Sequence, residues 1–241
     1  MNTAEPVWKR WFSPHQRISQ VPIEQVRQRL IETFARWGKP GAMRVDNGLP
    51  LGAPSGQLTP VLALWLIGID VDMIWNKPYC PQQNGRVEKM QDTTARWAEI
   101  HQAVDIADLQ VRLQASLILQ RTAYPVLRLP RKSRLSAFPG LETSRRPYAA
   151  TDFNLNRVHR FMTPKLYTRK VSGSGQIGHF GQVYSVGLSL AHQWVQLRLS
   201  ADGQRWQVLS DYKIVKELPA ITLTQQWIQN LTVFQRTKHQ T

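Results

Sequence analysis

The stretch MRVDNGLP, residues 43 to 50, decides how the fold is interpreted, and PYCPQQNGRVEKMQ, residues 78 to 91, is its counterpart. The first stretch begins with an apolar run that is too short for a helix, which predicts a buried strand ending at Asp46. An Asn-Gly pair supplies the turn that follows. The second stretch is a loop that opens a polar helix, with Glu88 in its first turns. Two carboxylates therefore stand at the ends of structural elements in a strongly basic chain.

Helix and strand patterns alternate around these two motifs. Apolar residues at three- and four-residue steps predict an amphipathic helix over 22–37, which glycine and proline then stop. The run TPVLALWLIG from residue 59 predicts a buried helix, and IDVDMIW, residues 69–75, predicts a short strand. Further helices are expected over 84–100 and 105–124. The first half of the chain is therefore expected to be mixed α/β.

The pattern changes in the second half of the chain. Residues 125–162 contain eight basic residues and only two acidic ones, which indicates a basic linker. From 163 to 219, strands of five to seven residues alternate with glycine turns, and an Asp-Gly hairpin is expected at residues 202–203. These features predict a small five-stranded barrel. Residues 220–241 form a tail in which a short helix is expected.

The composition indicates a polyanionic partner. The chain has 31 Lys and Arg residues against 16 Asp and Glu residues, a formal charge of +15 and a pI near 10.5, and nucleic acid is the partner that best matches this excess. No apolar run approaches the roughly 20 residues of a membrane-spanning helix. We therefore expect a soluble, cytoplasmic chain with no membrane partner. The single cysteine, Cys80, excludes an internal disulfide and a zinc site of the paired-cysteine type.

Three motifs in this order resemble the DDE transposase and retroviral-type integrase superfamily, especially bacterial insertion-sequence transposases with an integrase core. They are DNG at 46–48, an apolar helix that ends in LIGID, and PYCPQQNGRVE at 78–88. The two carboxylates are 42 positions apart, and their order and separation are more specific than either motif alone. Together with the basic linker and the small barrel, the resemblance covers most of residues 22–218.

The resemblance implies a fold and a division into domains. It implies an α/β fold in which an incomplete ribonuclease-H-like integrase core is followed by a small all-β SH3-like barrel. The corresponding boundaries are 1–124 for the partial core, 125–162 for the basic linker, 163–219 for the SH3-like β-barrel and 220–241 for the C-terminal tail.

The same resemblance implies a metal site for phosphoryl transfer to or from DNA. In this family, carboxylates from strand ends and a helix hold two divalent cations roughly 4 Å apart. Hard oxygen ligands suit Mg²⁺ or Mn²⁺. Asp46 and Glu88 are the expected second and third ligands and the expected catalytic residues, and Asn84 is expected to cap the helix that carries Glu88. The alternative is that Asp46 only closes an Asx turn and that Glu88 only contacts the helix dipole.

The first aspartate of the family has no counterpart in this chain. The carboxylates that precede Asp46 are Glu5, Glu24 and Glu32, and none of them lies in a strand pattern. We therefore expect a chain that is N-terminally truncated relative to the family, that binds metal weakly or not at all, and that is inactive alone as a DDE-type polynucleotidyl transferase. Its exposed sheet edge is expected to be covered in a homo-oligomer or by another partner. The aromatic segment 7–12 either packs at that edge or frays.

Basic side chains are expected to contact DNA phosphates, although charge runs often serve only to solubilise a linker. In WVQLRLS, residues 194–200, alternation directs Val195, Leu197 and Leu199 inward and Trp194, Gln196 and Arg198 outward. Trp206 is expected in the core or in barrel self-association. Four histidines, at positions 101, 159, 179 and 192, lack metal-ligand spacing and receive no role. The expected DNA-binding residues are Arg86, Lys89, Arg128, Arg131, Lys132, Arg134, Arg145, Arg146 and Arg198.

Two functions follow from these observations. The first is a transposase- or integrase-like protein for DNA transposition, which binds the transposon ends and target DNA and performs strand transfer once its carboxylate triad is complete. The second is a non-catalytic DNA-binding remnant or regulator that derives from a transposase. The DNG and NGRVE motifs favour the first function, and the missing first aspartate favours the second.

Overall fold

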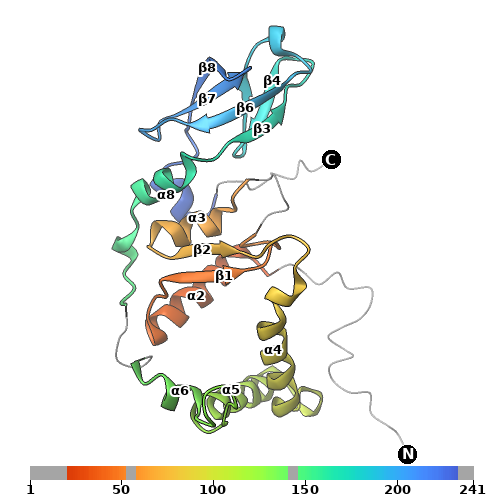
Figure 1. The fold of residues 1–241 in the computed structure, drawn as a ribbon, viewed down its shortest axis with the longest axis vertical. Helices are drawn as coiled ribbons and strands as arrows, with labels where there is room; N and C mark the ends of the chain where they lie inside the picture. The colour runs from red at the N-terminus through yellow and green to blue at the C-terminus, as the bar shows by residue number, and fades with distance from the viewer. Residues whose placement is uncertain (1–20, 53–57, 141–145, 233–241) are drawn as a thin grey trace, which may run out of the picture. The chain divides into compact units, whose positions relative to one another are not determined.

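A computed structural model of the chain shows a mixed α/β protein (Figure 1). The structure describes residues 21–52, 58–140 and 146–232. The chain divides into two compact units. The first unit contains Tyr79–Arg146, and the second contains Ile23–Pro78 and Pro147–Thr241. The expected packing of the aromatic segment 7–12 lies outside the described residues.

The described part of the first unit contains helices, whereas the second unit contains both helices and strands (Figure 1). The helices given for the described residues of the first unit are η1 (Pro81–Gln83), α4 (Gly85–Ala98), η2 (Ile100–Gln102), α5 (Ile106–Thr122) and α6 (Arg134–Ala137). The helices of the second unit are α2 (Ile23–Trp37), α3 (Val61–Gly68), η3 (Ala150–Asp152), α8 (Leu155–Met162), η4 (Leu188–Leu190) and α9 (Gln225–Gln229). Its strands are β1 (Ala42–Val45), β2 (Asp72–Trp75), β3 (Tyr167–Lys170), β4 (Gln176–His179), β5 (Gln182–Ser185), β6 (Trp194–Leu199), β7 (Arg205–Ser210) and β8 (Lys213–Pro219).

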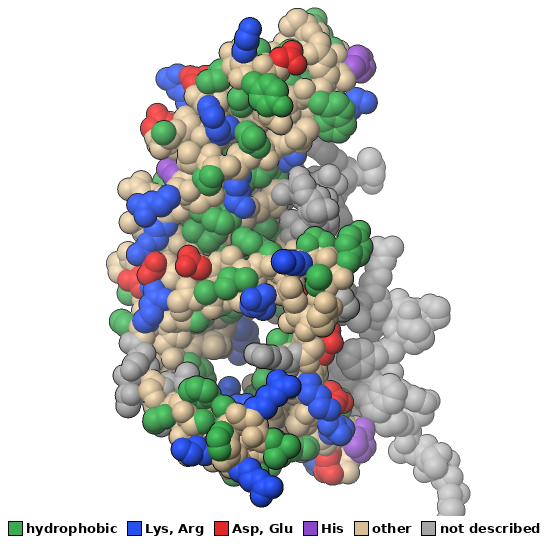
Figure 2. Space-filling view, viewed as in Figure 1, with side chains coloured by type: hydrophobic (Ala, Val, Ile, Leu, Met, Phe, Trp, Pro, Cys, Tyr) green, Lys and Arg blue, Asp and Glu red, His purple; other side chains and the backbone are tan. Residues whose placement is uncertain are grey.

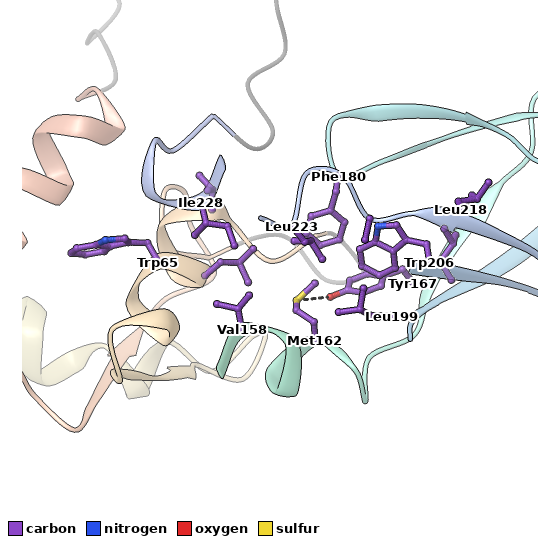
Figure 3. Packing of buried hydrophobic residues seen from close by; sticks show 14 of the residues in the cluster. Trp65, Val158, Met162, Tyr167, Phe180, Leu199, Trp206, Leu218, Leu223 and Ile228 are labelled. Atoms are coloured by element: carbon purple, nitrogen blue, oxygen red, sulfur yellow. Dashed lines mark hydrogen bonds between the residues drawn. The ribbon is translucent and has the colours of Figure 1, made fainter. Parts of the chain in front are cut away.

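Helix α3 lies at the centre of the hydrophobic core of the second unit. All eight of its residues are buried, and a helix that is apolar on every side is stable in water only when other elements surround it. It packs against β2, α8 and α9. Figure 3 shows the core continuing from Trp65 of α3 through Val158 and Met162 of α8 to Trp206 of β7. The tyrosine hydroxyl of Tyr167 at the start of β3 donates a hydrogen bond to the sulfur of Met162 over 3.4 Å.

Helix α3 also connects the two strands that carry the first sequence motif. Strands β1 and β2 are parallel, with Ala42 opposite Asp72 and Val45 opposite Trp75. Parallel strands require a crossover connection, and the buried α3 helix supplies it. The resulting β-α-β element places the C-terminal ends of β1 and β2 side by side, so Asp46 follows β1 next to the end of β2. The predicted buried helix is confirmed at Val61–Gly68, and a strand is found on either side of it. The predicted burial of the first strand is wrong, because the residues of β1 alternate between exposed and half-buried.

Three contacts join the end of α3 and the residues that follow α2 to the segment that precedes α8. A Cβ atom on Gly68 would lie 2.2 Å from the ring of Phe153, so only glycine fits at the end of α3. The amide of Asn154 donates a hydrogen bond to the carbonyl of Gly68 over 2.9 Å. The buried ammonium of Lys39 lies 2.7 Å from Asp152 Oδ2, and its hydrogen bond lowers the pKa of the Asp152 carboxyl.

The C-terminal strands form antiparallel sheets. Strands β3, β6, β7 and β8 form a four-stranded sheet in the order β3-β6-β7-β8, and β4 pairs with β5. The inward positions predicted for β6 are confirmed, because Val195, Leu197 and Leu199 are at most 1% exposed. Trp206 is fully buried, which confirms its predicted place in the core. The β6–β7 turn also follows the prediction, with Gly203 at a φ of +73°.

The predicted five-stranded barrel is not observed as a closed structure. Among the described residues, six strands divide between two sheets, and their hydrogen-bonded ladders do not close into a barrel. Strand β4 was not predicted, and it pairs only with β5. The link from β3 to β4 is a tight turn in which the amide of Ser172 donates to the carbonyl of Gln176 over 2.8 Å. A closed barrel would require hydrogen-bonded pairing of neighbouring strands all the way round, and the chain forms this turn between β3 and β4 instead.

We predict that Gly68→Ala destabilises the second unit by about 2 kcal/mol or more, because the new methyl group overlaps the Phe153 ring. Urea unfolding monitored by tryptophan fluorescence measures the change. Gly85→Ala is the matched control, since a Cβ atom there has no neighbour within 4 Å among the described atoms. A stability of Gly68→Ala equal to that of the wild-type chain would contradict the packing described here.

Candidate nucleic-acid interface

Asp46 is exposed at the end of β1, where it closes a turn. Its Oδ1 atom accepts a hydrogen bond from the amide of Gly48 over 3.0 Å, which is the geometry of an Asx turn. The Asn47 side chain donates to the carbonyl of Asn76 over 3.0 Å, so the turn is tied to the end of β2. A Cβ atom on Gly52 would lie 2.4 Å from the backbone of Asn47, so the loop must fold back closely. The structure therefore gives Asp46 a local role in this turn.

Glu88 lies in the first turn of α4 and is exposed. The carbonyl of Asn84 accepts hydrogen bonds from the amides of Val87 and Glu88, but the Asn84 side chain forms no capping hydrogen bond. The predicted side-chain cap is therefore wrong, because Asn84 has a helical backbone rather than the extended backbone of a capping residue. A carboxylate at a helix N-terminus is stabilised by the helix dipole.

The described residues do not form a metal centre around either carboxylate. Asp46 belongs to the second unit and Glu88 to the first. Within the described ranges, no three Asp, Glu, His or Cys side chains gather closely enough to bind one ion. A pair of divalent cations needs several oxygen ligands at once. Neither carboxylate alone has around it the donors that a cation pair needs, and the Mg²⁺ or Mn²⁺ site that the motifs imply stays a prediction.

Three cations project from one tight turn of the first unit. The turn spans residues 126–132, in which the amide of Val126 donates to the carbonyl of Lys132 over 3.0 Å and the amide of Lys132 donates to the carbonyl of Leu129 over 2.8 Å. Arg128, Arg131 and Lys132 are exposed and form no ion pair with a described residue. We call these three residues the basic turn. Its backbone hydrogen bonds hold three exposed positive charges within five consecutive residues.

The sequence on both sides of the basic turn lacks acidic residues, which would otherwise pair with these cations. No Asp or Glu occurs between Asp108 and Glu142. Figure 2 shows Lys and Arg side chains at the surface of this part of the molecule, in the region of α5 and α6. Cations without carboxylate partners are available to phosphate groups, which bind them strongly because the phosphate backbone carries a charge at every nucleotide. The basic turn is therefore a candidate, among the described residues, for contact with a nucleic-acid backbone.

The other predicted DNA-binding residues of the first unit have different surroundings. Lys89 is exposed but lies 3.6 Å from Asp92. Arg134 is partly buried and donates to the carbonyl of Gln120 over 2.7 Å, so it stabilises the end of α5. Arg146 is half-buried. The side chain of Arg86 and all of Arg145 lie outside the described residues.

Arg198 belongs to a polar ladder on the outer face of the C-terminal sheet. It lies opposite Gln207 and donates two hydrogen bonds to Gln207 Oε1, over 2.9 and 3.3 Å. Gln207 in turn donates to Glu217, which pairs with Arg205 at 2.8 Å. As predicted, Arg198 faces outward, where it lines a hollow of about 520 Å³. Its position beside a carboxylate-containing ladder makes it less available to phosphate than the basic turn.

His179 is a buried residue that the sequence pattern did not identify. It is 1% exposed, and neither ring nitrogen has a hydrogen-bond partner among the described residues. Its ring packs edge-on against Tyr167, Phe180 and Trp206, with centroid distances of 4.3 to 5.2 Å. Burial away from water and, to a smaller extent, the nearby positive charge of Arg169 together lower the pKa of His179 to about 2.

No protein-family model matches the chain. None of the described helices combines the length and the apolar character that crossing a membrane requires.

We predict that the neutral state of His179 makes the second unit sensitive to acid. The unfolded chain binds a proton on this residue below about pH 6.5, whereas the folded chain does not until about pH 2, so stability falls as the pH drops through 6.5. Between pH 7.5 and 5.5 the contribution is a loss of about 1.4 kcal/mol. Urea unfolding at the two pH values measures it.

His179→Phe should remove this part of the pH dependence, whereas His192→Gln, at an exposed position of the same unit, should retain it. An unchanged difference between the two pH values in His179→Phe would show that His179 is not the residue responsible.

Proposed function

We propose that this chain is a DNA-binding protein of the transposase and integrase type, which takes part in DNA transposition only together with a polypeptide that completes its carboxylate set. The observation that carries the proposal is the basic turn, in which three exposed cations have no acidic partner among the described residues. The formal charge of +15 is consistent with a polyanionic ligand. The motifs around Asp46 and Glu88 relate this DNA-binding protein to recombinases rather than to other basic proteins.

The finer description of the fold is part of the same proposal. We infer that β1, α3 and β2 correspond to one β-α-β element of a ribonuclease-H-like sheet, since the strands are parallel and the connecting helix is buried. We infer that the C-terminal strands correspond to an SH3-like module. The support is the meander β6-β7-β8 around a core that includes Tyr167 and Trp206. Neither inference depends on the function of the chain.

The proposed role of the two carboxylates is to bind divalent cations. In this proposal Asp46 and Glu88 are two of the three ligands of a divalent cation pair, and the third carboxylate comes from another polypeptide. The second candidate function, a non-catalytic DNA-binding remnant or regulator, is favoured by the lack of a three-residue ligand group in the described residues. Both functions require DNA binding, and they differ only in whether a completed complex transfers strands.

We predict that DNA affinity falls steeply with salt and that the basic turn contributes to this dependence. Replacing Arg128, Arg131 and Lys132 together by alanine should reduce the magnitude of the slope of log K against log salt by roughly 2 to 3, because each phosphate contact contributes about 0.9. Fluorescence anisotropy with a labelled duplex measures the affinity. The quantity compared is the slope of log K against log salt, which depends on the number of phosphate contacts.

A matched control removes three cations that already have carboxylate partners. Arg29 pairs with Glu32, Arg96 with Asp92, and Arg205 with Glu217. Alanine at these three positions changes the net charge by the same amount, and the slope should change less. Equal changes in the two triple variants would show that only net charge matters, and the basic turn would lose its assigned role.

We predict that the purified chain alone performs no strand transfer with Mg²⁺ or Mn²⁺, since the described donors do not form a two-cation site. The measurement is a strand-transfer assay that separates products on a denaturing gel, with DNA binding checked in the same samples. A product that Glu88→Gln abolishes would contradict the prediction and would establish a complete enzyme. Absence of product together with normal DNA binding is the expected result.

A further inference from the structure

Strands β4 and β5 form a hairpin that stands apart from the other C-terminal strands. Among the described strands they pair only with each other, whereas β3, β6, β7 and β8 share one continuous ladder. Side-chain hydrogen bonds attach the hairpin to that ladder. Arg169 Nε donates to the carbonyl of Gly178 over 3.2 Å, and the hydroxyl of Tyr184 donates to the carbonyl of Pro219 over 3.0 Å. The hairpin can therefore move away from the ladder without breaking any of the ladder's backbone hydrogen bonds.

Two glycines meet at the base of this hairpin. The carbonyl of Gly175 accepts hydrogen bonds from the amides of Val186 and Gly187, over 2.8 and 3.1 Å. Gly175 has a φ of +72° and Gly187 a φ of +117°, values that residues with a Cβ atom rarely adopt. A Cβ atom on Gly175 would lie 2.6 Å from the carbonyl carbon of Gly187, so the two backbones touch here. We call residues 176–186 the β4–β5 arm, and these two glycines are the positions at which its backbone can turn.

The β4–β5 arm buries polar atoms that have no hydrogen-bond partner. His179 is the last residue of β4, and neither of its ring nitrogens has a partner among the described residues. The indole nitrogen of Trp206 on β7 also has none, and the centroids of the two rings are 4.3 Å apart. Figure 3 shows Trp206 together with Phe180 and Tyr167, whose rings pack against it. Three polar atoms therefore leave water when the arm closes, and this desolvation destabilises the closed arm.

Protonation of His179 would destabilise the closed arm further. A neutral imidazole has one donor and one acceptor, whereas an imidazolium has two donors and a charge, and the closed arm offers neither donor a partner. The guanidinium of Arg169 on β3 is the charged group that acts on this ring, and it would repel the second positive charge. The rings packed against His179 belong to Tyr167, Phe180 and Trp206. Of these only Tyr167 titrates, and burial raises its pKa to about 12. The His179 ring therefore takes up a proton only once water reaches it.

We propose that the β4–β5 arm is an acid-sensitive switch, which opens at its two glycines and stays open when His179 takes up a proton. The opening is local, because the ladder β3-β6-β7-β8 keeps its hydrogen bonds. It brings His179 and the indole of Trp206 into water, and it uncovers the buried aromatic surface of Tyr167 and Trp206. The proposal does not depend on DNA binding or on the carboxylates.

The opening has a defined pH dependence. The pKa of His179 is about 2 in the closed arm and about 6.5 once the ring is in water. The closed arm therefore has its full stability above pH 6.5 and loses stability as the pH falls through 6.5. Between pH 7.5 and 5.5 the equilibrium constant for opening should rise about tenfold.

Residue-resolved amide hydrogen exchange of the full chain at pH 7.5 and 5.5 tests the proposal, with rates corrected for the pH dependence of unprotected amides. An isolated two-stranded hairpin is barely stable, so the amides of β4 and β5 exchange whenever the arm is open. Their protection factors should be at least about tenfold lower than those of Trp206 and Val208 at both pH values. They should fall about tenfold between pH 7.5 and 5.5. Low concentrations of urea should change them little, because a local opening exposes little surface.

Two variants identify the residue responsible. His179→Phe should remove the tenfold pH difference in β4 and β5, whereas His192→Gln, at an exposed position of the same unit, should retain it. An unchanged pH difference in His179→Phe would overturn the proposal. The wild-type chain is a sufficient test if His179→Phe fails to fold. Equal protection of the β4–β5 arm and of Trp206 and Val208 at both pH values would show that only the whole unit opens, and this result would also overturn the proposal.

Discussion

Burial of α3 on every side is the constraint on which the second unit depends. A helix such as VLALWLIG has no polar face to leave in water, so β2, α8 and α9 must cover it. That requirement ties the parallel strand pair to the C-terminal sheet in one continuous core. It also fixes Gly68 against Phe153 and thereby sets where α8 begins. The turn that carries Asp46 follows β1, and β1 pairs in parallel with β2 through the crossover that α3 supplies.

The first unit has no comparable buried apolar helix among its described residues. Its helices meet through hydroxyl and amide groups, and their leucines remain in an open groove. Its loop carries cations without carboxylate partners among the described residues. We propose that the basic turn binds DNA and that another polypeptide completes the carboxylate set, so that the chain works in an assembly on DNA. The proposed function requires both partners: DNA for the basic turn and another polypeptide for the carboxylate set.

Strong periodicity made much of the fold predictable. Helices α2, α3 and α5 and strand β6 agree with the predicted segments. Helices α2 and α5 have apolar residues at three- and four-residue steps, β6 alternates, and α3 is a continuous apolar run. Helix α8 was missed because its arginines obscured Val158 and Met162, which are fully buried. Strand β4 was missed because Ile177 is its only buried apolar residue between polar and glycine neighbours. At the candidate site, the end of β1 was predicted correctly, but the convergence of Asp46 with Glu88 stays a prediction. His179 has no sequence signal, since a single histidine reveals neither burial nor missing partners.

Amide hydrogen exchange of the full chain, resolved by residue under native conditions, tests the role of α3 most directly. The amides of Leu64 to Ile67 should be among the slowest to exchange, together with those of Trp206 and Val208, because all of them open only when the whole core opens. The amides of the basic turn should exchange much faster. Exchange in α3 as fast as in that exposed turn would show that the helix is not enclosed, and the account of the second unit would be wrong.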